Sequence, residues 1–362
     1  MGETSNKKAL IAMSGGVDSS VAALLMKQAG YDCIGVMMKL LNNNGIDFTE
    51  KSCCTADAAE DARNVAHSLG MNFYVFNFVD EFRNTVIAPF VHSYESGETP
   101  NPCIDCNRTM KFGVLFRKAM ELGCDKIVTG HYARVEQDNR TGRYLLKKAA
   151  NAAKDQSYFL YCLSQEVLAH TVFPLGEYAS KDEIRELAKQ NALPTASKHD
   201  SQDICFIPDG DYAKFVREFS GHDYPVGDFI GFDGTVFGKH KGIIGYTVGQ
   251  RKGLGIAWSE PLYVCSKNVE KNTITLGTAE QLTCESVTAH SFNWISLEKP
   301  PTEPISVLAR TRCHGKDVPA TVTANDDGTV TVRFAEPQRA TSPGQSVVLY
   351  DGDIVVGGGI IS

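Results

Sequence analysis

Residues 12–19, with the sequence AMSGGVDS, constrain the fold of this chain more than any other segment. An apolar run at 9–12 precedes the two glycines, and residues 20–26 follow with apolar side chains at helical spacing. This order predicts a strand, a tight turn and a helix, in which backbone N–H groups and the helix N-terminus face an anion. The spacing differs from the Walker and dinucleotide-binding glycine patterns. The segment indicates a phosphate-binding turn of another kind, the alternative being a simple glycine turn.

The residue types of this turn suit a bound nucleotide. Gly15 and Gly16 allow a backbone geometry and a close approach that a Cβ atom would prevent. Ser14 and Ser19 can donate hydrogen bonds to phosphate oxygens, and Asp18 can hold a magnesium ion. The turn is therefore the first candidate site.

The composition sets limits on the class of protein. The length of 362 residues allows two or three domains, and no apolar run long enough for a membrane span is present. The net charge of −7 argues against a strongly cationic nucleic-acid binder but allows local basic patches. Because the turn begins almost at the N-terminus, we expect no signal peptide. The eleven cysteines then indicate a cytoplasmic, reducing compartment, where thiols are catalytic, metal-binding or buried.

The first part of the chain alternates between strand and helix patterns. Strand-like runs at 33–38, 73–76 and 126–130 are separated by helical patterns at 55–69 and 80–94. This alternation predicts an α/β fold with a doubly wound parallel sheet, whose ligands bind at the carboxyl ends of the strands. The turn after Met13 and the residues after Thr129 would then lie at the same edge.

The pattern changes after about residue 206. Residues 224–255 are rich in glycine, and from residue 261 onward the pattern is mostly β. The alternating runs at 321–324 and 329–332, joined by Asn-Asp-Asp-Gly, predict a hairpin. We therefore expect a catalytic domain at 1–206, a small central domain at 207–265 and a C-terminal β-barrel at 266–362.

A second informative segment carries two cysteines three residues apart. Asn101 is a plausible helix N-cap, and Pro102 suits the first helical position. Cys103 and Cys106 would then lie on one face of the first turns, where the helix start and nearby basic side chains favour a thiolate. By itself this spacing fits zinc, iron–sulfur, redox and accidental interpretations about equally.

The remaining cysteines are less informative on their own. Cys205 lies within Ile-Cys-Phe-Ile, a context typical of a small buried hydrophobic residue. Cys53 and Cys54 are adjacent in a polar loop, which favours a lightly packed pair over a metal site. Five more, in apolar or β contexts, are expected to be packing residues: Cys33, Cys124, Cys162, Cys265 and Cys284.

Taken together, the motifs resemble the bacterial tRNA 2-thiouridylases (tRNA-specific 2-thiouridine synthases) of the ATP pyrophosphatase-loop superfamily. The motifs are SGGVDS at 14–19, TPNPCIDCN at 99–107, GHYAR at 130–134, KDQSYFL at 154–160, SQDICFI at 201–207, GYTVGQRKGLG at 245–255 and SPGQ at 342–345. They span nearly the whole chain. Argininosuccinate, GMP and NAD synthetases share the first motif but not the cysteine pattern.

The resemblance implies an enzyme that uses ATP with Mg²⁺ to adenylate O2 of the wobble uridine of tRNA. A persulfide, relayed from a sulfur-carrier protein or cysteine desulfurase, then attacks C2, and AMP and pyrophosphate are released. It implies that Cys106 is the nucleophile and Cys205 the persulfide carrier, joined at one stage in a disulfide, in a protein expected to be a monomer.

The resemblance also assigns binding positions. Those for ATP are Ala12, Met13, Ser14, Gly15, Gly16, Val17, Asp18, Ser19, Met38 and Gly130. Those for the target base are Asn101, Pro102 and Cys103, and those for tRNA are His131, Lys154, Asp155, Gln156, Arg312, Cys313 and Gln345.

The sequence departs from the family pattern at Cys103, where many members carry Asp. That carboxylate has been assigned a role in activating the neighbouring cysteine, and a thiol cannot serve as the same base. Cys103, Cys106 and Cys205 could instead hold a [4Fe–4S] cluster with one open iron position. We favour the persulfide route, with Cys103 as a base-pocket residue or spare thiol.

Basic residues gather at 239–241, 251–252 and 310–316, and together they could follow an RNA backbone. The target base would have to leave the anticodon stack to reach ATP. A synthetase-type ligase would explain the first motif but not the cysteines. A non-catalytic RNA- or zinc-binding module would leave the SGGVDS turn without a role.

Overall fold

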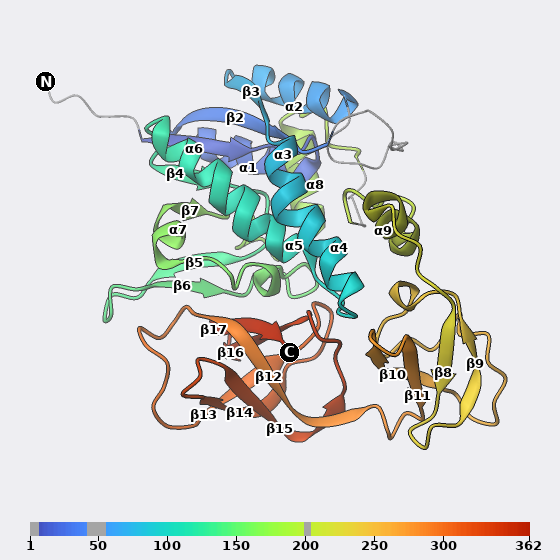
Figure 1. The fold of residues 1–362 in the computed structure, drawn as a ribbon. Helices are drawn as coiled ribbons and strands as arrows, with labels where there is room; N and C mark the ends of the chain where they lie inside the picture. The colour runs from blue at the N-terminus through green and yellow to red at the C-terminus, as the bar shows by residue number, and fades with distance from the viewer. Residues whose placement is uncertain (1–6, 42–55, 199–203) are drawn as a thin grey trace, which may run out of the picture. The chain divides into compact units, whose positions relative to one another are not determined.

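The computed structural model describes residues 7–41, 56–198 and 204–362, and the chain divides into two compact units (Figure 1). The sheet unit comprises Met1–Val86, Cys103–Gly210 and Asp353–Val355, and the barrel unit comprises Ile87–Pro102, Asp211–Gly352 and Val356–Ser362. Each unit is described by itself below.

The helices are α1 (Val17–Gln28), α2 (Ala56–Ser68), α3 (Val79–Phe82), α4 (Ala88–Glu95), α5 (Pro102–Asp105), α6 (Leu115–Glu121), α7 (Gln165–His170), α8 (Lys181–Gln190) and α9 (Tyr212–Ser220), with π-helices η1 (Arg83–Ile87) and η2 (Cys106–Val114) and 3₁₀ turns η3 (Ser157–Phe159) and η4 (Ile243–Gly245). The strands are β1 (Lys8–Ala12), β2 (Asp32–Lys39), β3 (Asn72–Asn77), β4 (Lys126–Val128), β5 (Arg134–Gln137), β6 (Tyr144–Lys147), β7 (Thr171–Val172), β8 (Gly227–Ile230), β9 (Val236–His240), β10 (Tyr263–Asn268), β11 (Thr273–Gly277), β12 (Thr283–Trp294), β13 (Ile305–Arg310), β14 (Val318–Ala324), β15 (Val330–Arg339), β16 (Ser346–Asp351) and β17 (Ile354–Ile361). None of the helices in the described ranges is long and apolar enough to cross a membrane.

The sheet unit is built on a five-stranded sheet in the order β3-β2-β1-β4-β7, with every pair parallel. Ile11 belongs to the apolar cluster that α1, α2 and α8 form with the sheet, while Leu10, which is equally buried, lies outside that cluster. Both faces of β1 are therefore covered, which explains its continuous apolar run. The predicted α/β class with a parallel sheet is confirmed.

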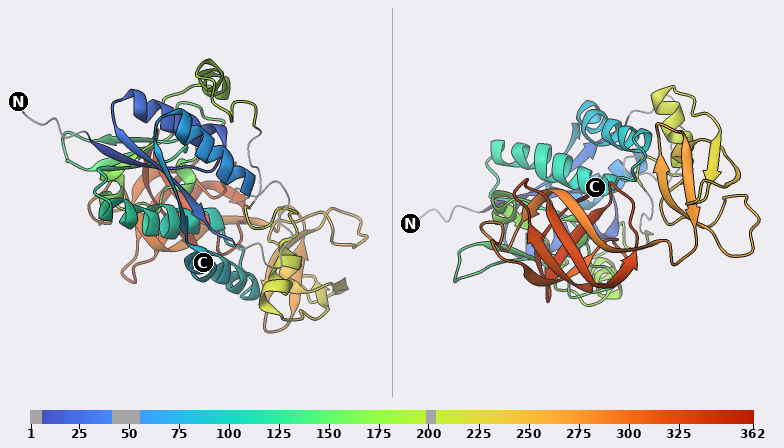
Figure 2. Two further views of the ribbon diagram at one scale, coloured as in Figure 1. Left: turned by 90° about the horizontal axis from the view of Figure 1, so that it is seen from above. Right: turned by 60° about the horizontal axis from the view of Figure 1, so that its bottom comes forward.

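The barrel unit contains two all-β parts. A four-stranded sheet has the order β10-β11-β8-β9, and six further strands follow one another as β12-β15-β14-β13-β16-β17. Pairing of β12 with β17 closes these six strands into a barrel (Figure 2). Val330 and Val332 point into its core, and Ala324 pairs with Val330 across the predicted hairpin. The expected C-terminal barrel is confirmed.

Candidate functional site: a phosphate-facing turn and a cysteine helix

The turn between β1 and α1 is fixed by backbone packing. Gly15 has φ +73°, and a Cβ atom there would lie 2.3 Å from the carbonyl oxygen of Ala58 on α2. The Ser14 N–H donates to the Ser19 hydroxyl at 3.2 Å, and the two hydroxyl oxygens are 3.3 Å apart. Helix α1 begins after Gly16 without a side-chain cap from the described residues. The open helix end and the paired hydroxyls are suited to an anion.

Asp18 lies in the first turn of α1 and already contacts a cation. Its Oδ1 accepts hydrogen bonds from the Tyr132 hydroxyl at 2.7 Å and from the Lys181 ammonium at 2.6 Å. The Lys181 ammonium also lies 5.7 Å from the centre of the Tyr132 ring. A carboxylate oxygen is the donor type that Mg²⁺ prefers, and in this structure the Asp18 oxygen is paired with Lys181 instead.

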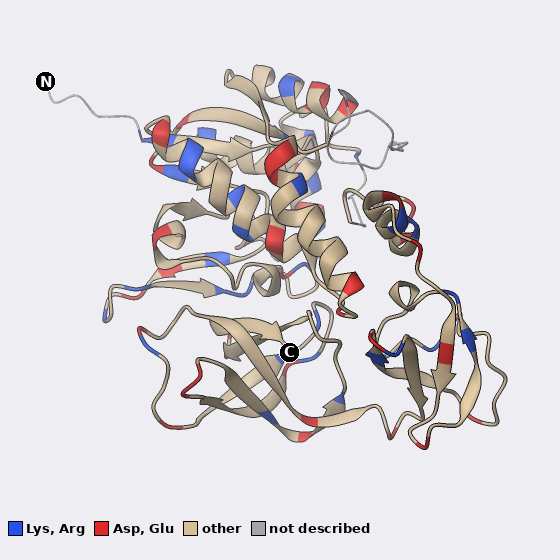
Figure 3. Cartoon of the chain, in the orientation of Figure 1, with Lys and Arg blue, Asp and Glu red and all other residues tan. Residues whose placement is uncertain are grey.

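A second lysine contacts the turn at Gly15, three residues before Asp18. Lys198 donates to the Gly15 carbonyl at 3.3 Å and forms an ion pair with Asp61 on α2. Neither Lys181 nor Lys198 was predicted from the sequence as part of this site. Acidic and basic residues are interspersed along the helices (Figure 3), and no pattern distinguishes these two lysines from the others.

The end of β4 packs directly against the turn. A Cβ atom on Gly130 would lie 2.9 Å from the Asp18 carbonyl carbon and 2.9 Å from the Ser19 nitrogen. Residues after Thr129 therefore meet the residues after Met13 at the carboxyl edge of the sheet, as a parallel sheet predicts. Met38, the other expected ATP position, is half-buried near the end of β2.

His131 connects this edge to the cysteine segment. Its Nδ1 lies 2.6 Å from the Thr129 hydroxyl and its Nε2 lies 3.3 Å from the Lys111 ammonium. The rings of Phe112 and Phe173 lie 6.1 Å and 5.8 Å from the imidazole. Burial, followed by the charge of Lys111, lowers the pKa of His131 well below its usual value. The imidazole is therefore neutral, with Nε2 accepting from the ammonium and Nδ1–H facing Thr129.

The two cysteines lie on one continuous helical run formed by α5, η2 and α6. Pro102 opens it, as predicted, while Cys103 is exposed and Cys106 is half-buried at the start of the π-helix η2. Asn107, only 1% exposed, donates from Nδ2 to the Phe159 carbonyl at 3.0 Å. Its Oδ1 has no hydrogen-bond partner among the described residues. The π geometry of this segment was not apparent from the sequence, and such segments are frequent at functional sites.

Cys205 belongs to the same unit. It is half-buried beside Phe206, whose ring makes an edge contact with Phe82 at 5.7 Å. In the described ranges, no group of three or more His, Cys, Asp or Glu side chains could hold a metal ion. Cys103, Cys106 and Cys205 are thus not arranged as cluster ligands in this structure, and we derive no step through an iron–sulfur cluster.

Burial raises the pKa of the other thiols described, to about 11 for Cys33 and about 12 for Cys162. These two thiols remain protonated at neutral pH, which agrees with the packing role expected for them. Cys53 and Cys54 lie outside the described residues.

Three of the expected tRNA positions, residues 154–156, lie next to Tyr132 in the sheet unit. The backbone of Gln156 donates to the Tyr132 carbonyl at 2.8 Å, and its side-chain Oε1 accepts from the Tyr132 N–H at 2.9 Å. Asp155 Oδ1 accepts from the backbone of Ala149 and Ser157, and Lys154 is half-buried beside it. Gln156 thus holds the segment between β4 and β5 that carries His131, while Asp155 holds the backbone around Ala149 and Ser157.

In the barrel unit, two expected contact regions are held together. Gln345 Nε2 donates to the Thr99 carbonyl at 2.6 Å, and the Thr99 N–H donates to the Pro343 carbonyl at 2.8 Å. The segment that leads to Asn101 and Pro102 is therefore fixed beside the SPGQ turn. Sequence order alone could not have placed them together.

The structure also places Arg312 beside the central glycine-rich segment. Arg312 donates to the Ala340 carbonyl at 3.1 Å, and Arg339 donates to the Gly249 carbonyl at 3.2 Å. A Cβ atom on Gly249 would lie 3.3 Å from the Arg312 guanidinium. Burial raises the pKa of the neighbouring Cys313 thiol. Arg312, in the predicted basic cluster at 310–316, therefore lies beside Gly249, two residues before the cluster at 251–252.

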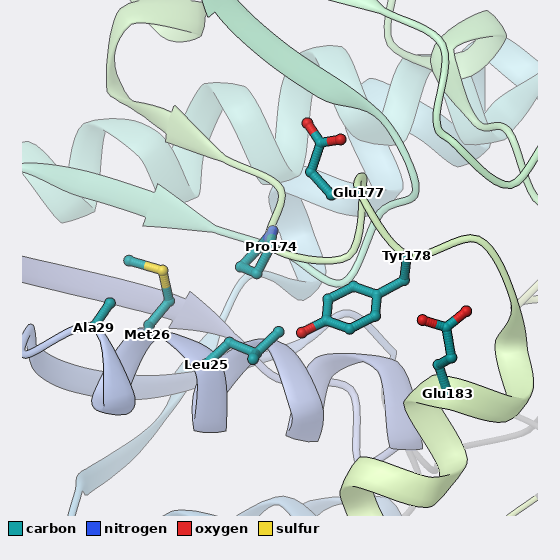
Figure 4. Close-up of a pocket in the computed structure, with 7 residues that line it drawn as sticks. All are labelled: Leu25, Met26, Ala29, Pro174, Glu177, Tyr178 and Glu183. Carbon is teal, nitrogen blue, oxygen red and sulfur yellow. The ribbon is translucent and has the colours of Figure 1, made fainter.

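A separate pocket of about 460 Å³ lies at the other end of α1 (Figure 4). Leu25, Met26 and Ala29 line one side, and Tyr178 extends across it toward Leu25. The three residues Leu25, Met26 and Ala29 are at the C-terminal end of α1, whereas the turn at residues 12–19 is at its N-terminal end. The pocket is therefore not part of the candidate site.

The fold and site together define a nucleotide-binding α/β domain carried on a chain with two further β parts. Comparison with family models agrees: residues 7–209 match the tRNA methyl transferase HUP domain, 213–278 the tRNA methyl transferase PRC-barrel domain, and 284–361 the aminomethyltransferase β-barrel domain.

The chain is also similar to curated proteins along nearly its full length. It is 50% identical to tRNA-specific 2-thiouridylase MnmA of Clostridioides difficile, with 98% of each chain covered. It is 47% identical to the MnmA of Acetivibrio thermocellus, with 99% of each covered. The chain belongs to the tRNA-specific 2-thiouridylase family, which confirms the resemblance drawn from its motifs.

Among solved structures, the U34-tRNA thiolase NcsA from Methanococcus maripaludis with its [4Fe-4S] cluster gives a TM-score of 0.34 and 17% identity. The match covers 59% of this chain and 67% of that one. A likeness this distant has no bearing on the chemistry of the present chain.

Proposed function

We propose that this protein is an ATP-dependent sulfurtransferase that converts the wobble uridine of tRNA to 2-thiouridine. The observation that carries the proposal is the direct packing of Gly130 on the first turn of α1. This contact joins the phosphate-facing turn to the strand end at His131, and His131 in turn contacts the helix that carries Cys106. Family membership supports the same substrate and reaction.

In the first proposed step, uridine O2 attacks the α-phosphorus of ATP, pyrophosphate leaves and N3 releases its proton. Residues 12–19, Met38 and Gly130 would bind the nucleotide, with the serine hydroxyls and the α1 N-terminus facing its phosphates. Asp18 would hold the accompanying Mg²⁺, an ion that offsets phosphate charge when bound. Asn101, Pro102 and Cys103 would contact the base.

In the second proposed step, the terminal sulfur of a Cys205 persulfide attacks C2, and AMP leaves with the former O2. The Cys106 thiolate then attacks Cys205 Sγ. The outer sulfur stays on the base, and a Cys106–Cys205 disulfide forms. The sulfane sulfur is reduced while the two thiols are oxidised, and a dithiol reductant must reopen the disulfide before the next cycle. The persulfide would come from a sulfur-carrier protein or cysteine desulfurase.

For tRNA, we propose contacts at His131, Lys154, Asp155 and Gln156 in the sheet unit. Arg312, Cys313 and Gln345 would contribute from the barrel unit. The basic residues next to Arg312 support an electrostatic component, so affinity should fall as salt concentration rises.

The test is a reconstitution with ATP, unmodified tRNA and a persulfide donor, with AMP, pyrophosphate and 2-thiouridine measured together. Cys106→Ser and Cys205→Ser should each abolish 2-thiouridine while leaving pyrophosphate release. Cys265→Ser, which alters a half-buried thiol on β10, is the matched control and should retain activity. Normal thiolation by either active-site variant would refute the role of that cysteine. Iron-dependent activity of anaerobically purified protein would refute the persulfide route.

A further inference from the structure

Among the lysines near the carboxyl edge of the sheet, Lys111, Lys181 and Lys198 have different partners. Lys181 is paired with Asp18, and Lys198 is paired with Asp61. Lys111 contacts His131 instead, and it forms no ion pair with a carboxylate of the described residues. Of these three lysines, Lys111 alone carries a positive charge that no carboxylate of the described residues pairs with.

The partner of Lys111 is suited to hold a cation without neutralising it. The His131 ring is enclosed by Phe112 and Phe173, and its Nδ1 faces the Thr129 hydroxyl at 2.6 Å. A neutral imidazole accepts one ammonium proton through Nε2 and leaves the other two N–H donors of Lys111 available. A carboxylate in the same place would cancel the charge that an anion requires.

The Lys111 ammonium is connected to both parts of the candidate site, the turn at residues 12–19 and the helix that carries Cys106. His131 directly follows Gly130, which packs on the first turn of α1. Lys111 also lies five residues after Cys106 within the π-helix η2. The i→i+5 hydrogen bonds of a π-helix bring residues with this separation into successive turns. One helical segment thus carries Cys106 and Lys111, and the Lys111 ammonium contacts His131, the residue that follows Gly130.

We propose that Lys111 is a catalytic residue whose ammonium binds the α-phosphoryl group of ATP and then the departing adenylate, with His131 as its positioning residue. This inference rests on the proposed adenylation. A cation at the α-phosphorus stabilises the charge that develops there and lowers the barrier to both the formation and the loss of the adenylate.

The test measures tRNA-dependent pyrophosphate release in a Cys106→Ser background, where sulfur transfer is blocked. Lys111→Met should slow single-turnover release about 100-fold, the usual loss for one preorganised donor. Lys118→Met is the matched control, because it removes the same charge from the same helical run at an exposed position. It should leave the rate unchanged. If the parent Cys106→Ser protein releases no pyrophosphate, the proposed function fails, which is a distinct outcome.

Rescue experiments separate catalysis from support of the fold. Ethylammonium should restore part of the rate to Lys111→Ala, because the small amine can occupy the vacated position. His131→Gln, which keeps a neutral acceptor, should retain more activity than His131→Phe at equal thermal stability. An unchanged rate of pyrophosphate release in Lys111→Met, accompanied by a raised pKa of the Cys106 thiol in the Cys106-containing protein, would overturn the proposal. Lys111 would then serve only the thiolate.

Discussion

Two parts of the candidate site are held in place by different means: the phosphate-facing turn at residues 12–19, and the cysteine helix, which is the run of α5, η2 and α6. In the turn, backbone packs on backbone: Gly15 lies against the Ala58 carbonyl and Gly130 lies against the first turn of α1. Such contacts leave no space for a Cβ atom. They can be formed only by glycine, and this requirement is visible in the sequence.

The cysteine helix is held by side chains from distant parts of the chain. Asn107 bonds the Phe159 carbonyl, Thr109 meets Thr85, and Lys111 meets His131. Each contact involves an ordinary residue whose partner cannot be identified from local pattern. The turn should therefore tolerate almost no substitution, whereas the helix should respond in graded steps as each contact is removed.

Gly15→Ala should have the largest effect. The left-handed φ costs an alanine about 1–2 kcal/mol, and the forced contact with Ala58 adds about 1–3 kcal/mol. Urea denaturation should therefore show a loss of several kcal/mol, together with loss of nucleotide binding. Gly30→Ala is the control, because Gly30 has φ +83° with nothing within 4 Å of the new Cβ. Equal losses in the two variants would mean that backbone packing does not hold the turn.

Asn107→Ala comes next and tests the cysteine helix. It leaves the half-buried Phe159 carbonyl with only the weak Cys162 thiol donor of the described residues, at 3.8 Å, which should cost about 1–3 kcal/mol. Asn191→Ala provides the comparison, because Asn191 donates to the Leu187 carbonyl at 2.9 Å in an exposed position. Its loss should be within about 0.5 kcal/mol. A similar small effect at Asn107 would indicate that this contact does not hold the helix in place.

The same contrast explains how much the sequence could predict. The parallel sheet, the turn and the closing barrel follow from apolar runs and glycines, and the structure has them. Lys181, Lys198 and the Lys111–His131 contact were missed because they join residues far apart along the chain. The π geometry of η2 also escaped, since its residues have ordinary helical spacing. The domain boundaries expected after 206 and 265, and the assigned site residues, remain predictions.

Acidification should lower the stability of the folded protein through His131, which joins the turn to the cysteine helix. The pKa of His131 is lowered in the folded protein, so below its usual value the unfolded chain binds a proton that the folded chain does not. Stability is then lost as pH falls below about 6.5, by at most about 1.4 kcal/mol per pH unit. Denaturation of wild type and His131→Phe at several pH values isolates this contribution. Parallel pH profiles for the two proteins would contradict it.

The smallest effect is expected where the two π-helices meet. The Thr85 hydroxyl on η1 lies 3.1 Å from the Thr109 hydroxyl on η2 and 2.8 Å from the Glu81 carbonyl, so its one proton is shared between them, and Thr109 itself donates to the Asp105 carbonyl at 2.8 Å. Thr85→Val should cost about 1 kcal/mol, the usual net value of one hydrogen bond. A double-mutant cycle with Thr109→Val should give a coupling energy of at least about 0.5 kcal/mol. Additive losses would show that the two π-helices are held independently.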